Sequence, residues 1–102
     1  MEKLLTLYER IDEELEDAME YAELAEAWEE SPEEMRVFLS LSSQEMEHAH
    51  ILQGLVNRHI SEMGKEHGSV PENVHLLNEH MKKRHAKWSA AIKAEHDELM
   101  KR

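Results

Sequence analysis

Three residues of this chain have the types and the spacing of metal ligands: Glu14, Glu45 and His48. Glu45 and His48 are three residues apart, so on a helix they share one face, with Cβ atoms about 5–6 Å apart, and can bind one metal centre. Each acid lies on an otherwise apolar helix face, where an unpaired carboxylate costs several kcal/mol. Carboxylate and imidazole ligands suit iron or manganese better than a structural zinc site.

Two helices joined by a short turn are predicted to bring these residues together. Apolar residues at three- and four-residue steps predict a helix over about 2–29 and a second over about 32–63. Ser31 is the expected N-cap of the second helix, with Pro32 at its first position and Glu34 completing a capping box. A short connection makes the helices antiparallel, so Glu14 and Glu45, equidistant from the turn, should face each other.

The apolar stripes that support these two helices are interrupted only at the candidate ligands. The first stripe comprises Leu7, Ile11, Ala18, Tyr21, Ala25 and Trp28, and the second comprises Phe38, Leu41, Leu52 and Leu55.

A third helix is predicted over about 71–100, after a C-terminal cap at Gly64 and a polar loop over 65–70. Residues 1–63 hold 17 acidic against four basic residues, whereas residues 64–102 hold six against eight. The third helix is therefore expected to pack on an acidic hairpin and to serve assembly. The acidic field also favours cations over nucleic acid as partners. Residues 1–102 are expected to form a single all-α domain.

The composition limits the other chemistry that this chain can perform. It contains no cysteine, so disulfides, zinc ribbons and iron–sulfur centres are excluded. No apolar run reaches membrane-spanning length and no secretory signal is visible, so we expect a cytoplasmic protein without a membrane partner. The remaining histidines have no common face and are interpreted as surface or interface residues: His50, His59, His67, His75, His80, His85 and His96.

The three candidate ligands make up half of a known set. Di-iron carboxylate proteins built on four helices use one Glu from each of two helices and a Glu-x-x-His pair from each of the other two. A twofold dimer of the hairpin would supply all of these groups around two Fe ions and would form a four-helix bundle. The active form is therefore expected to be a homodimer or a higher homo-oligomer.

The same residues resemble the encapsulated ferritins, a half-ferritin family of the rubrerythrin-like branch of the ferritin-like superfamily. The resemblance covers roughly residues 7–60. In that family a ligand Glu precedes a Tyr by seven residues, as Glu14 precedes Tyr21, and the second helix carries Glu-x-x-His-Ala, as in Glu45, His48 and Ala49.

The resemblance implies a ferroxidase that oxidises Fe(II) to Fe(III) with dioxygen at an inter-subunit site, for iron storage or detoxification. It implies that Glu13 and Glu16 attract incoming metal and that Tyr21 hydrogen-bonds a ligand carboxylate. It also implies an encapsulin shell as a partner and a location inside that nanocompartment, although this chain ends Glu-Leu-Met-Lys-Arg where such proteins have a Gly-, Ser- and Leu-rich docking tail. Two other functions stay open: rubrerythrin-like peroxide reduction at the same site, and a non-enzymatic helical dimerisation module.

Overall fold

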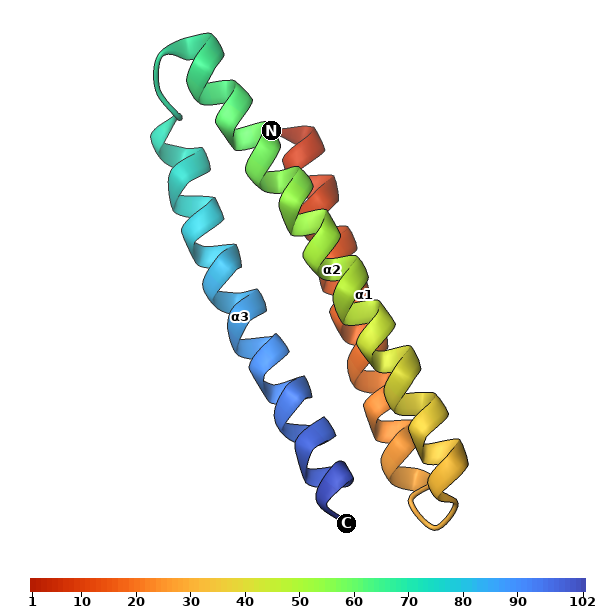
Figure 1. Ribbon diagram of the computed structural model, residues 1–102. Coiled ribbons are helices and arrows are strands. Elements are labelled where there is room, and N and C mark those ends of the chain that lie inside the picture. The colour runs from red at the N-terminus through yellow and green to blue at the C-terminus, as the bar shows by residue number, and fades with distance from the viewer.

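The computed structural model describes all 102 residues, which form three helices and no strand. Helix α1 spans Glu2–Ala27, α2 spans Pro32–His67 and α3 spans Glu72–Lys101. Together they make a slender molecule measuring 56 × 17 × 16 Å (Figure 1). The predicted all-α class is confirmed. None of the three helices combines the length and the hydrophobicity needed to span a membrane.

Helices α1 and α2 form the antiparallel hairpin expected from their short connection (Figure 1). Ser31 is the N-cap of α2 and Pro32 occupies the first turn, where its missing N–H leaves no hydrogen bond unmade. The predicted capping box is wrong, because the Ser31 side chain makes no capping hydrogen bond. The backbone carbonyl of Ser31 instead accepts the N–H of Met35 at 2.9 Å.

The predicted end of the second helix at Gly64 is also wrong. Helix α2 continues to His67, and Gly68 is the residue that adopts the left-handed conformation, with φ of 77°. Lys65 and Glu66 are good helix formers and extend the helix through a glycine whose helical cost is only about 1 kcal/mol. A Cβ at Gly64 would lie 3.5 Å from Val70 Cγ2, so the chain that returns after Gly68 packs against this position.

Helix α3 packs mainly against α1 and has few contacts with α2. Basic residues of α3 and its C-cap meet acids of α1 and of the turn that follows it. Arg84 Nε lies 3.5 Å from Asp12 Oδ1, and Arg102 Nη1 donates to Glu29 at 2.7 Å. Oppositely charged residues therefore line the contact between the third helix and the hairpin, as the charge distribution predicted.

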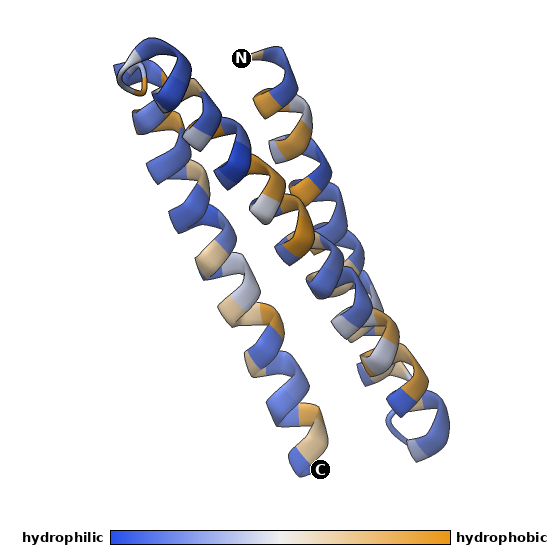
Figure 2. Ribbon diagram, turned by 45° about the horizontal axis from the view of Figure 1, so that its top comes forward, coloured by the Kyte–Doolittle hydropathy of each residue, from blue (hydrophilic) through white to orange (hydrophobic).

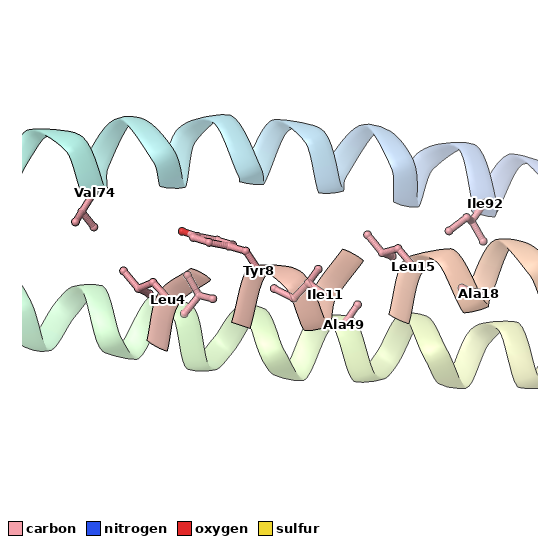
Figure 3. Close-up of a cluster of buried hydrophobic side chains, with 9 residues drawn as sticks. Leu4, Tyr8, Ile11, Leu15, Ala18, Ala49, Val74 and Ile92 are labelled. Carbon is pink, nitrogen blue, oxygen red and sulfur yellow. The ribbon is translucent and has the colours of Figure 1, made fainter. Parts of the chain in front are cut away.

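One apolar core joins the three helices, and α1 supplies most of it (Figure 3). Apolar positions recur along α1 and α2, whereas α3 is mostly hydrophilic (Figure 2). Nine buried residues form the main cluster: Leu4, Tyr8, Ile11, Leu15, Ala18, Ala49, Val56, Val74 and Ile92. A smaller cluster near the turn between α1 and α2 contains Ala25, Met35, Leu39 and Leu99.

The predicted apolar stripe of the second helix coincides only in part with the side that α2 buries, since Leu52 and Phe38 pack against the two apolar clusters. Leu55 is 42% exposed and Leu41 is only half-buried. The buried positions are Met35, Leu39, Ser42, Ala49 and Val56. Leu41 and Leu55 therefore lie beside the hairpin contact, on a side that the chain leaves partly open.

Candidate metal centre

Glu14 of α1 and Glu45 and His48 of α2 come together in the middle of the hairpin. One ligand atom from each lies within 4.8 Å of the others. His48 Nδ1 is 3.5 Å from Glu14 Oε2 and 3.8 Å from Glu45 Oε2. The antiparallel pairing places the two glutamates at the same height, and the three-residue step within α2 places His48 beside Glu45. The predicted cluster is thus present in a single chain.

The cluster runs from the interior of the hairpin to solvent. The Glu14 side chain is 11% exposed, that of Glu45 is 21% exposed and that of His48 is 53% exposed. Helix α3 does not cover it, because α3 contacts α1 through Asp12, about 200° around the helix axis from Glu14. The three ligand side chains therefore open onto a face of the hairpin opposite to α3.

Two carboxyl groups this close cannot both ionise freely. A hydrogen bond shared with the Glu14 carboxyl group raises the pKa of Glu45, and burial and the charge of Glu14 raise it further. The charge of His48 acts in the opposite direction. Without a cation, the cluster consequently holds two carboxyl groups in an electrostatically unfavourable arrangement.

The donor set fits a divalent first-row metal. Bonds of about 2.1 Å place the ligand atoms of one ion up to about 4.2 Å apart, so small side-chain rotations would bring these three donors onto one ion.

A second close pair of carboxyl groups, Glu26 and Glu95, does not form such a mixed carboxylate and imidazole donor set. The Glu26 hydrogen bond raises the pKa of Glu95, but no histidine joins the pair and Arg102 Nη1 lies 3.9 Å from Glu26.

Exposed apolar residues extend from the cluster along both helices of the hairpin. On α2, Val37 and Ile51 are 58% and 56% exposed, and they lie eleven residues before and three after His48, spacings that keep them on its side of the helix. On α1, Leu24 and Trp28 follow Glu14 by ten and fourteen residues. We call this surface the open face, and define it by Leu24, Trp28, Val37, Ile51 and Leu55 around the cluster.

The other predicted site residues do not join the cluster. Glu13 is exposed and pairs with Arg10, while Glu16 lies about 200° around α1 from Glu14 and points to solvent. No hydrogen bond joins Tyr21 to Glu14 or Glu45 in this chain, because Tyr21 lies two helical turns beyond Glu14.

Sequence reasoning missed Arg10, whose Nη2 donates to Glu14 Oε1 at 3.1 Å. The four-residue spacing between Arg10 and Glu14 was an available signal. Sequence reasoning also predicted no partners for the histidines of α3 that contact the hairpin. His85 Nε2 lies 2.7 Å from Asp12 Oδ1 and His96 Nε2 lies 2.7 Å from Ser42 Oγ.

Comparison of this chain with protein families, with characterised proteins and with solved structures finds no match. The function of the cluster is therefore inferred from its own residues.

Proposed function

We propose that this protein is a ferroxidase whose di-iron site is completed by a second copy of the chain. The observation that carries the proposal is the grouping of Glu14, Glu45 and His48 within 4.8 Å on a face that the chain itself leaves uncovered. One chain offers three donors, which is half of the set that four-helix di-iron proteins use.

A twofold pairing of open faces would account for two unusual properties of this surface, its exposed apolar side chains and its closely spaced acids. It would bury apolar side chains such as Val37 and Ile51, which are more than half exposed in one chain. It would also bring four carboxylates and two imidazoles around one axis, and two ferrous ions would balance the four negative charges. Binding energy for the dimer would then come from the apolar residues, and the metal would relieve the repulsion among the acids.

The roles of the residues follow from their positions. Glu14 and Glu45 supply the negative charge that attracts ferrous ion and stabilises the ferric product more strongly. His48, the most exposed of the three ligands, offers Nδ1 toward both carboxylates and borders the route from solvent. Iron bound there would supply the redox chemistry: two ferrous ions would each give up one electron, and dioxygen would take up both with two protons to leave as hydrogen peroxide.

The open face supports a second candidate, a helical dimerisation module without metal chemistry, because its apolar residues favour association by themselves. Metal content separates the two functions. A dimerisation module would associate equally in chelator and in ferrous ion, whereas the ferroxidase should bind two irons per dimer.

Ferrous oxidation by matched variants tests the proposal. Glu14→Ala, Glu45→Ala and His48→Ala should each abolish rapid oxidation, measured as ferric absorbance after anaerobic loading and exposure to oxygen. Glu23→Ala and Glu47→Ala change exposed acids of the same two helices and should keep the parent rate. Ligand variants that oxidise iron at the parent rate would refute the site, and faster oxidation with peroxide than with oxygen would favour peroxide reduction.

A further inference from the structure

Arg10 reaches the candidate metal centre from the solvent side of α1. Its Nη2 donates to Glu14 Oε1 at 3.1 Å, and its Nη1 pairs with Glu13, one residue before the ligand. The Arg10 side chain is 54% exposed while that of Glu14 is 11% exposed. A fully charged guanidinium is therefore in direct contact with the most buried acid of the cluster.

The two oxygens of Glu14 have different partners. Oε1 accepts from Arg10, and Oε2 faces His48 Nδ1 at 3.5 Å. No lysine and no other arginine pairs with Glu14, Glu45 or His48. Arg10 is thus the one permanent positive charge at the cluster, and it contacts the Glu14 oxygen that does not face His48.

We propose that Arg10 is the resident counter-ion of this centre, against whose charge a divalent cation must bind. The inference rests on the proposed metal site. In the metal-free protein Arg10 neutralises Glu14, and when metal arrives the guanidinium transfers its hydrogen bonding to Glu13. Arg10 accordingly weakens metal binding. It also stabilises the metal-free protein, because it offsets the charge of Glu14.

Arg10 has two opposing effects on metal affinity, and their relative sizes decide whether it strengthens or weakens metal binding. Its hydrogen bond orients the Glu14 carboxylate, which favours binding. Its positive charge lies one carboxylate away from a divalent ion, and repulsion between a unit and a double charge is twice that between two unit charges. Holding the Glu14 side chain in one rotamer contributes less to metal affinity than this repulsion removes. Removing the charge should therefore tighten metal binding.

The same charge affects association of two chains. Pairing open faces without metal would bring four carboxylates together, and the two Arg10 side chains would offset half of that charge. Loss of Arg10 should consequently weaken the metal-free dimer and leave the metal-loaded dimer intact. Metal would then control assembly more strongly in the variant than in the parent.

The experiment compares three variants of the full chain after chelator treatment. Arg10→Gln removes the charge and Arg10→Lys keeps it. The control variant Arg58→Gln removes an exposed arginine away from the cluster that has the same four-residue spacing to a glutamate, Glu62. Calorimetric titration with Mn²⁺ in oxygen-free buffer measures affinity without redox turnover, and sedimentation measures association with and without Mn²⁺.

Arg10→Gln should bind Mn²⁺ roughly three- to tenfold more tightly than the parent at low ionic strength. It should also dissociate more readily when metal-free. Arg10→Lys and Arg58→Gln should match the parent in both measurements. Equal or weaker Mn²⁺ binding by Arg10→Gln would overturn the inference, because Arg10 would then serve only to orient Glu14. Failure of the parent to bind Mn²⁺ or Fe²⁺ would instead overturn the proposed function, and the inference with it.

Discussion

Replacing Glu45 by glutamine should stabilise the metal-free protein, although it removes a proposed ligand. Glu14 and Glu45 offer oxygens within 4.8 Å of each other. Two unit charges at that separation repel by about 1 kcal/mol in water and by about 3.5 kcal/mol at the effective dielectric constant of 20 that suits partly buried sites. Glutamine keeps the shape of the side chain and can donate a hydrogen bond to Glu14. At neutral pH we expect the free energy of unfolding to rise by about 1–3 kcal/mol.

The gain should depend on pH in a direction fixed by the raised pKa of Glu45. A carboxyl group whose folded pKa lies above its unfolded value of 4.5 favours folding below that value, and this contribution is lost as the pH rises through the folded pKa. The parent should therefore approach Glu45→Gln in stability as the pH falls toward 4.5. Above the folded pKa, the difference between the two proteins should reach its full size.

Urea denaturation of chelator-treated parent and variant, at matched protein concentration and at several pH values, measures this difference. Glu47→Gln removes an exposed acid two residues along the same helix and should change stability by less than about 0.5 kcal/mol. Added Mn²⁺ should stabilise the parent and not the Glu45→Gln variant. A variant that is less stable than the parent at neutral pH, or a gain that does not change with pH, would refute the reasoning.

Three further predictions concern the contacts of α3 and the open face. Tyr8→Phe removes a buried 2.8 Å hydrogen bond to Asn78 and should cost about 1–3 kcal/mol in urea denaturation without changing Mn²⁺ affinity. Burial lowers the pKa of His96 from 6.5, so acidification below about pH 6.5 should destabilise the fold, and His96→Gln should make the unfolding midpoint less dependent on pH there. Ile51→Asp should weaken association in sedimentation with and without metal, whereas Leu76→Asp, at an equally exposed leucine of α3, should not.

The candidate site could be predicted from the sequence because its geometry is local. The turn near Ser31 is short, so the hairpin fixes which residues of α1 and α2 share a height, and this places Glu14 opposite Glu45. The three-residue step to His48 needs only a helix. No knowledge of how α3 packs was required, since α3 does not touch the cluster.

The contacts of α3 could not be predicted in the same way. Asp12 pairs with His85 across 73 residues and Ser42 with His96 across 54, and both depend on the side of α1 that α3 occupies. Ser42 is fully buried, although nothing in its local pattern marks a serine as core. The end of α2 was misplaced for a related reason. Two glycines lie four residues apart, and only the return of Val70 onto Gly64 shows which of them reverses the chain.

The grouping of two acids with a histidine at the open face argues for chemistry there. On the side of α3, Tyr8 donates to Asn78 and Asp12 lies 2.7 Å from His85, and the close carboxyl pair of Glu26 and Glu95 has no histidine beside it. At the open face, Glu45 is held against Glu14, and this contact raises the pKa of Glu45. A hairpin selected only for packing would place apolar residues at Glu14 and Glu45, since burying like charges opposes folding. A divalent cation that needs both carboxylates gives a physical reason for keeping them there.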